Sequence, residues 1–244
     1  MKKKLITRIR KLIGLAILLA VGNITIAQKS ERTFFEQVAK PVTTKGWIDF
    51  KESNLLNPQT LFTEHPEMFG LTVLDHMEQI RMKTDEIGYT HFRYQQYHKG
   101  IKIIGAESIL HHNGNYLKSM NGNIAEQLKI NIDPKISTEL AFTTAKNSIN
   151  AETFIWEIET EATSLNELIK DPKDLQKPIG ELVICRKNWD GSFTNENLTL
   201  AYSFRMIVLP MYESKEVYID AVSGEIIIQI PLTTNCNNNT ENTT

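Results

Sequence analysis

The chain has 244 residues, of which 41% are hydrophobic and 23% are charged, and its formal net charge is −2. These proportions are those of a globular protein, and they exclude a fibrous or wholly disordered chain. The length suits one large domain or two domains of roughly 100 residues each.

Residues 1–27 have the features of an export signal. Six basic residues and no acidic residue open the chain, Leu12–Val21 is apolar, and Thr25-Ile26-Ala27 offers small residues at a cleavage site. The apolar run is shorter than the ~20 residues that a membrane-spanning helix needs, which favours cleavage over anchoring. We therefore expect an exported protein that is periplasmic or extracellular.

Removal of this segment changes the charge balance. It leaves 21 basic and 29 acidic residues, a net charge of −8. Such a surface argues against nucleic acid or an anionic membrane as the partner, and it permits a partner with a cationic surface.

The next segment, residues 28–54, is a weakly patterned lead-in, and an early strand is indicated by Trp47, Ile48 and Phe50. A helix is then predicted over Gln59–Phe69. Its expected features are Asn57 as the N-cap, a break at Pro66 and an end at Gly70.

An antiparallel meander is expected to follow this helix, because aromatic and apolar residues alternate and turn residues separate the runs. Asp85–Gly88 is predicted to be a solvated turn, Gly105 a kink, Asn113-Gly114 a hairpin turn and Asn121-Gly122 a further turn. The predicted strands are Leu71–Thr84, Tyr89–Tyr97, Ile101–His111 and Tyr116–Met120.

The second half begins after Asp133-Pro134. Ser137 is expected to cap a helix over Thr138–Ile149, and a shorter helix is possible over Leu165–Lys170. A helix packed on an antiparallel sheet gives the α+β class for both halves. Residues 231–244 are rich in Asn and Thr, and we expect a disordered tail. The predicted strands are Phe154–Thr160, Glu181–Arg186, Leu198–Leu209, Glu216–Asp220 and Glu225–Ile230.

Catalytic motifs are missing from the sequence. No His-Glu-x-x-His, Cys-x-x-Cys or Gly-x-Ser-x-Gly pattern occurs. His111 and His112 are adjacent on a predicted strand, so their side chains point to opposite faces and are poorly placed to share a metal. We therefore predict no catalytic residue, no metal and no cofactor.

Two groups of residues leave alternatives open. The polar set in the strand Tyr89–Tyr97 is either a network that contacts a partner or specifies the sheet, or the solvated face of an antiparallel sheet. The two cysteines, Cys185 and Cys236, are either joined by a disulfide or separate, with Cys185 buried and Cys236 paired outside this chain.

Residues 55–128 resemble a fungalysin/thermolysin propeptide (FTP) domain. The resemblance rests on the run of residues 89–103, followed by Gly105-Ala106-Glu107, His111 and glycine turns. It implies that the motif and interaction candidates are His91, Arg93, Gln95, Gln96, Gly100 and His111.

Residues 133–230 are similar to a PepSY domain, which has a cystatin-like fold. The similarity rests on the helix after Ser137 and on the hairpin of residues 216–226. It adds Tyr218, Asp220 and Gly224 to the candidates.

The order of export signal, FTP-like domain and PepSY-like domain is similar to the pro-region of a secreted thermolysin-like zinc metalloprotease. This resemblance implies two small α+β domains that assist folding of the protease domain and inhibit it, with that domain as the partner in cis or in trans. The catalytic domain with its zinc helix is expected to lie outside this chain. The alternatives are a stand-alone periplasmic or extracellular inhibitor or binding module, and a truncated remnant.

Overall fold

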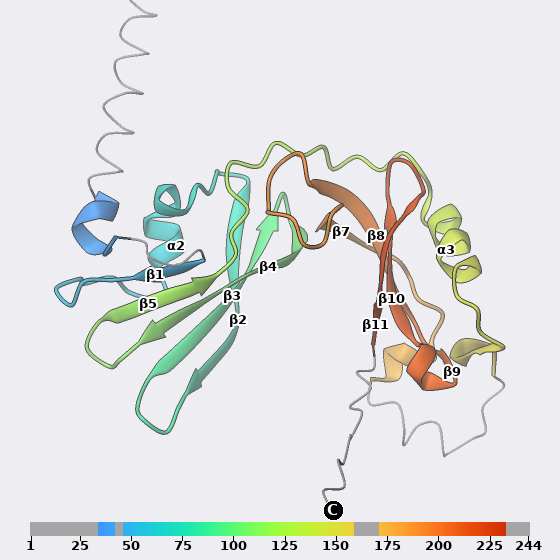
Figure 1. Ribbon diagram of the computed structural model, residues 1–244, viewed down its shortest axis with the longest axis horizontal. Helices are drawn as coiled ribbons and strands as arrows, with labels where there is room; N and C mark the ends of the chain where they lie inside the picture. Colours follow the sequence, from blue (N-terminus) through green and yellow to red (C-terminus); the bar gives the residue numbers. More distant parts are fainter. Residues whose placement is uncertain (1–33, 42–45, 159–170, 233–244) are drawn as a thin grey trace, which may run out of the picture. The chain divides into compact units, whose positions relative to one another are not determined.

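The computed structural model describes residues 34–41, 46–158 and 171–232 (Figure 1). Strands outnumber helices, so the protein is sheet-rich and broadly α+β. Backbone proximity divides the chain into two compact units, which we describe separately. The N-terminal unit contains residues 1–96 and 107–127, and the C-terminal unit contains residues 97–106 and 128–244.

Five strands build the sheet of the N-terminal unit. β1 pairs with β5, β5 with β4, and β3 with both β4 and β2, so β2 and β1 lie at the edges. β3 is joined to β4 by Lys99 and Gly100, which have φ angles of +49° and +78°. Two positive φ values are what a tight I′ hairpin turn requires, and Gly100 supplies one of them without strain. The strands are β1 (Trp47–Asp49), β2 (Asp75–Thr84), β3 (Thr90–His98), β4 (Ile101–His112) and β5 (Leu117–Gly122).

The helical segment before β2 is shorter than predicted. α2 covers only Leu61–Glu64, and the 3-10 helix η1 covers Pro66–Phe69 before Gly70 in the left-handed conformation. The predicted break and end are therefore confirmed, but the start is wrong. The Asn57 side chain accepts a hydrogen bond from the backbone of Gln59 at 3.0 Å and so forms a turn, and the N-cap is Thr60.

The core of the N-terminal unit lies between these helices and one face of the sheet. Phe92 and Tyr94 of β3 point into it, where they join the aromatic and aliphatic side chains of the helices and neighbouring strands. Its largest members are Phe50, Leu61, Phe62, Phe69, Leu110 and Leu117. Because alternate residues of a strand point to opposite faces, His91 and Arg93 lie on the other face.

The predicted turn at Asn121-Gly122 is wrong, because both residues belong to β5. Asn121 lies opposite Ile109 and Gly122 opposite Ser108. Gly122 has φ +133°, and a Cβ atom there would lie 2.2 Å from the carbonyl oxygen of Glu107. The glycine therefore marks a close approach of two strands rather than a reversal of the chain.

The C-terminal unit is an antiparallel sheet with a helix on one face. Its order is β7-β8-β10-β11, and the first half of β4 pairs parallel with β7, Lys102 opposite Val183. The helix α3 (Thr138–Asn147) packs on β8 and β10 and buries Ala141 and Ala145. The Ser137 hydroxyl accepts a hydrogen bond from the Leu140 backbone at 3.2 Å, which confirms the predicted cap. The strands are β7 (Glu181–Arg186), β8 (Leu198–Met206), β10 (Lys215–Asp220) and β11 (Ile226–Pro231).

The predicted strand Phe154–Thr160 is mostly wrong. Of the predicted residues that the structure describes, 154–158, only Phe154 lies in a strand, β6 (Thr153–Phe154), which pairs with β9 (Val208–Leu209), and the 3-10 helix η2 (Ile155–Glu157) follows. Phe154 and Ile155 are both buried. A strand that buries one face cannot bury two successive side chains, whereas a tight helical turn can. Two further 3-10 helices are η3 (Pro172–Leu175) and η4 (Met211–Glu213).

Several predictions concern residues outside the described part. These are the export signal, the helix Leu165–Lys170, Cys236 and most of the tail. Pro231 and Leu232 do belong to the folded part, since β11 includes Pro231 and the Leu232 backbone donates to the Ser214 carbonyl at 2.9 Å. Among the described residues, no helix is long and apolar enough to cross a membrane.

Candidate functional site: a polar network on the N-terminal sheet

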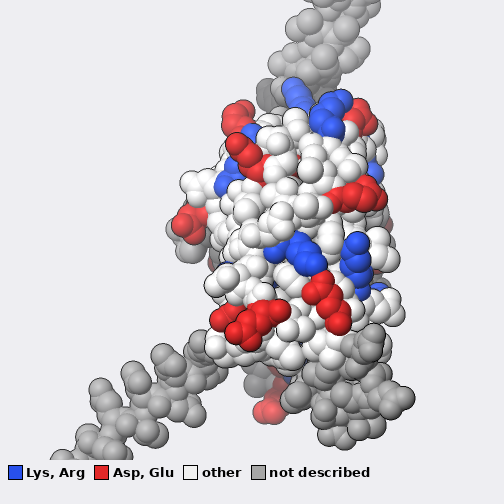
Figure 2. Space-filling view, turned by 90° about the vertical axis from the view of Figure 1, so that its right-hand side faces the viewer, with Lys and Arg blue, Asp and Glu red and all other residues white. Residues whose placement is uncertain are grey.

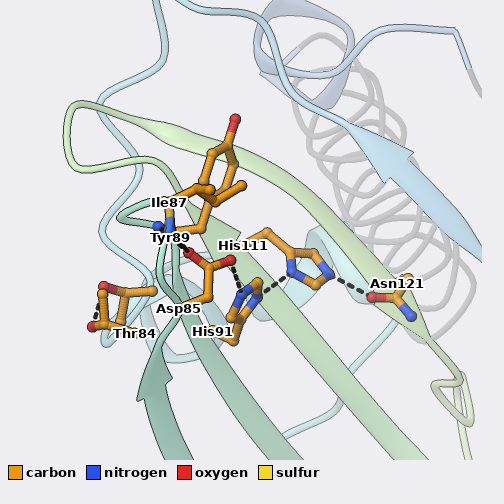
Figure 3. A network of polar contacts seen from close by, with 8 residues as sticks. Thr84, Asp85, Ile87, Tyr89, His91, His111 and Asn121 are labelled. Atoms are coloured by element: carbon orange, nitrogen blue, oxygen red, sulfur yellow. Dashed lines mark hydrogen bonds and ion pairs between the residues drawn. The ribbon is translucent and has the colours of Figure 1, made fainter.

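Four side chains form a continuous hydrogen-bonded chain across the N-terminal sheet (Figure 3). Asp85 Oδ2 lies 3.0 Å from His91 Nε2, and His91 Nδ1 lies 2.7 Å from His111 Nδ1. His111 Nε2 lies 2.6 Å from Asn121 Oδ1. The chain therefore runs from the β2–β3 turn through β3 and β4 to β5.

Strand register explains why these residues meet. His111 lies opposite Ser119 and Ile109 opposite Asn121, so Asn121 is the diagonal neighbour of His111 on the same face. Asp85 is fixed by its own turn, because its Oδ1 accepts hydrogen bonds from the backbones of Ile87 (3.1 Å) and Tyr89 (2.9 Å).

The turn is solvated as predicted and Asp85 is partly exposed, but Asp85 also makes contacts that the sequence did not predict. One carboxylate oxygen holds the turn and the other binds His91. The hydrogen bond from His91, together with those from the turn backbone, lowers the pKa of Asp85. Both side chains remain about one-third exposed, at 34% each, so the pair is accessible from solvent.

Two further contacts extend the network into a surface. Arg93 Nη1 lies 2.7 Å from Glu107 Oε2. The Trp47 ring stacks on His111 with centroids 5.7 Å apart and planes inclined by 18°. Trp47 is 39% exposed and Arg93 is 42% exposed. We call this surface the polar face, and its members are Trp47, Asp85, His91, Arg93, Glu107, His111 and Asn121.

Gln95 and Gln96 do not belong to the polar face, because they are 1% and 0% exposed. The Gln96 amide donates to the Ala125 carbonyl and accepts from the Ala125 backbone N–H, both at 2.8 Å. Together with Gly100 in its turn, these residues shape the fold. The polar set of β3 is therefore divided between a half-exposed network and buried structural amides, and it is not simply a solvated face.

The candidates in the C-terminal unit also serve the fold. Asp220 Oδ1 accepts from the backbones of Val222 (2.8 Å) and Ser223 (2.9 Å), and its Oδ2 accepts from the Thr199 hydroxyl at 2.9 Å. Burial raises the pKa of Asp220, but these hydrogen bonds more than offset it, so the pKa is lowered. Gly224 has φ +79° and closes the same turn.

Tyr218 and Cys185 lie inside the C-terminal unit, 3% and 0% exposed. Burial raises the pKa of the Tyr218 hydroxyl, and the nearby Glu216 carboxylate adds to this. Burial, together with the negative charge of Asp220, raises the pKa of the Cys185 thiol to about 12. The disulfide with Cys236 stays a prediction, because Cys236 lies outside the described residues.

The sequence reasoning missed Trp47, Asp85 and Asn121 as members of the site. Asp85 could have been found from the sequence, because an Asp that opens a turn often binds the backbone of that turn and the strand with His91 follows directly. Asn121 could not, because the Asn-Gly pair indicates a turn more strongly than a strand. In the part of the chain that the structure describes, no group of three or more His, Cys, Asp or Glu side chains is arranged to hold a metal ion.

One side of the C-terminal unit carries charges of both signs. Figure 2 shows the side that bears α3, where acidic and basic side chains are interspersed among uncharged ones. Such a mixed surface does not select a partner by charge.

Most of the polar face lies in a stretch of the chain that matches a known protein family. Residues 75–124 match the Fungalysin/Thermolysin Propeptide Motif, and this stretch runs from β2 through β5. It therefore contains every member of the polar face except Trp47. The match covers a minority of the chain. No curated protein matches the chain. Among solved structures, the Bacillus megaterium YpeB C-terminal domain is similar with a TM-score of 0.36 and 11% identity, over 77% of this chain and 72% of that one.

Proposed function

We propose that this chain is the non-catalytic pro-region of a secreted thermolysin-like zinc metalloprotease, which assists folding of the catalytic domain and inhibits it. The observation that carries the proposal is the propeptide-motif match over residues 75–124. In this proposal residues 55–128 and 133–230 act as FTP-like and PepSY-like domains, and residues 1–27 direct export.

The polar face is the surface that we expect to contact the protease. Trp and Arg side chains are frequent among the residues that dominate binding. Here they are already held in place, because Arg93 is paired with Glu107 and His111 lies between His91 and the Trp47 ring. Such pre-organisation reduces the entropy lost when a partner binds.

The test measures refolding and inhibition with residues 28–244. A denatured thermolysin-like catalytic domain is diluted with and without the protein, and recovered activity is followed with a fluorogenic peptide. In a second assay the protein is titrated onto the native protease. We expect recovery to rise and activity to fall at micromolar protein. Failure of both assays with several such proteases would overturn the proposal.

A pair of aromatic substitutions tests the surface. Trp47→Ala should weaken inhibition about tenfold or more, because it removes an exposed aromatic ring from the expected contact. Tyr212→Ala is the matched control, since Tyr212 is 60% exposed in the C-terminal unit. Equal inhibition by both variants would exclude the polar face as the contact, provided both unfold at the wild-type denaturant concentration.

A further inference from the structure

The hydrogen bonds that link Asp85, His91 and His111 determine which ring nitrogens carry protons. The Asp85 carboxylate can only accept, so His91 Nε2 carries a proton. His91 Nδ1 and His111 Nδ1 lie 2.7 Å apart, a separation at which one must donate and the other accept. The two Nδ1 atoms therefore share one proton.

The orientation of Asn121 then fixes the charge. With Asn121 Oδ1 directed at His111 Nε2, that nitrogen must donate, so the two imidazoles hold three protons and one positive charge. If the amide is turned over, its NH₂ group donates to His111 Nε2, and the imidazoles hold two protons and are neutral. Both arrangements satisfy every hydrogen bond of the chain, because the oxygen and nitrogen of an amide occupy equivalent positions.

We propose that the His91–His111 pair is a protonation switch that turns the Asn121 side-chain amide over and so reverses the hydrogen-bonding character of the polar face. In the protonated state Asn121 presents its NH₂ group beside Trp47, and in the neutral state it presents its oxygen. Neither atom is otherwise committed, since among described residues the Asn121 side chain bonds to His111 alone.

The charges around the pair have both signs. β2 pairs with β3 and brings the cations Arg81 and Lys83 to the face that bears His91, because the Thr84 and Thr90 side chains meet on the other face. Asp85 from the β2–β3 turn balances the protonated pair, whereas Arg93 from β3 is already paired with Glu107 from β4. From β1, Asp49 shares the row of Ser119 and His111, and its carboxylate accepts from the Trp47 indole at 3.2 Å. Histidine is the side chain whose charge ordinarily changes between about pH 5 and 8, and the test therefore spans that range. The inference concerns the protein alone and does not depend on the proposed function.

The test is NMR spectroscopy of the purified protein with ¹⁵N-labelled histidine and asparagine. At pH 5 we expect three protonated ring nitrogens in the pair, and at pH 8 two, with His111 Nε2 as the atom that loses its proton. The Asn121 amide resonances should move with the same midpoint, and an N–N coupling should join the two Nδ1 atoms. A His111 Nε2 that keeps one protonation state from pH 5 to 8 would overturn the switch.

A variant provides an independent test. Asn121→Asp supplies an oxygen that can only accept, so His111 should stay protonated and the midpoint should rise by about one pH unit or more. Asn115→Asp, at the exposed hairpin tip, adds the same charge away from the network and is the matched control. Equal midpoints in the two variants would contradict the inference. If Asn121→Asp does not fold, the wild-type spectra still decide.

Discussion

The two units each hold a turn with an aspartate, but they give its second oxygen a different kind of partner. In the N-terminal unit, Asp85 and Glu107 bind side chains from other parts of the sheet, and these partners remain about one-third exposed or more. In the C-terminal unit, Asp220 accepts from the backbone of its own turn, as Asp85 does, but its second oxygen binds a neutral group, the Thr199 hydroxyl. Two turn aspartates of similar geometry thus bind an ionisable imidazole in one unit and a neutral hydroxyl in the other. Three changes test this comparison.

The largest effect is expected at Gly122, where the N-terminal sheet leaves no room for a side chain. Gly122→Ala would place a Cβ atom 2.2 Å from the Glu107 carbonyl oxygen, so β4 and β5 must separate. We expect the free energy of unfolding of this unit to fall by about 4 kcal/mol or more, measured by denaturant titration. Gly114→Ala is the control, because Gly114 also has positive φ but nothing lies within 4 Å of its Cβ position. Equal losses in both variants would show that backbone conformation, and not close approach, is what Gly122 provides.

A smaller loss is expected at the turn of the C-terminal unit. Asp220→Ala removes the acceptors of three hydrogen bonds and should lower the free energy of unfolding by about 2–3 kcal/mol. The reactivity of Cys185 reports on this unit in a Cys236→Ser background, because the thiol is buried and its pKa is raised to about 12. Labelling should therefore begin at lower denaturant in the variant.

The control for this change lies in the same turn. Glu225 is exposed, and in the described chain its carboxylate has no hydrogen-bond partner. Glu225→Ala should leave labelling of Cys185 unchanged. If Asp220→Ala behaves like Glu225→Ala, the fixed-turn role assigned to Asp220 is wrong.

The smallest effect is expected at Asp85, and it depends on pH. Because the folded-state pKa is lowered, the carboxylate stabilises the fold above its unfolded pKa of about 3.9, and this contribution is lost as pH falls through the folded value. The stability difference between wild type and Asp85→Asn should therefore be full at pH 7 and should shrink below about pH 4. Unfolding titrations at several pH values measure it, with Glu86→Gln as the neighbouring control. A difference that is constant from pH 7 to pH 2 would contradict the role of the ionised carboxylate.

Much of the fold could be predicted because local signals agree with tertiary packing. The aromatic alternation of β3, the turn at Asn113-Gly114 and the cap at Ser137 were all confirmed. The failures have two causes. Asn57 forms a local turn with Gln59 instead of capping the helix. Asn121 and Phe154 take part in strand pairing with residues far along the chain, which single-sequence patterns do not report.

The site was predicted less completely than the fold. His91, Arg93 and His111 were found through the family resemblance, and the structure brings all three onto one face. Their partners Asp85 and Asn121 were missed, because only the turn geometry and the strand register bring these residues beside the histidines. The other candidates lie at buried positions or in turns, and a part for them in an interaction stays a prediction; they are Gln95, Gln96, Gly100, Tyr218, Asp220 and Gly224.

Gln96 has a consequence for how the chain leaves the sheet after β5. Its terminal amide meets both the N–H and the C=O of Ala125, which is the pairing that a neighbouring peptide group would offer. The Gln96 side chain thus takes the place of a paired strand residue and holds the chain where it leaves the sheet. The shape of the carboxamide is not sufficient for this, because Gln96→Glu keeps the shape but loses the donor. Position 96 therefore requires a side chain that both donates and accepts a hydrogen bond, as a peptide group does.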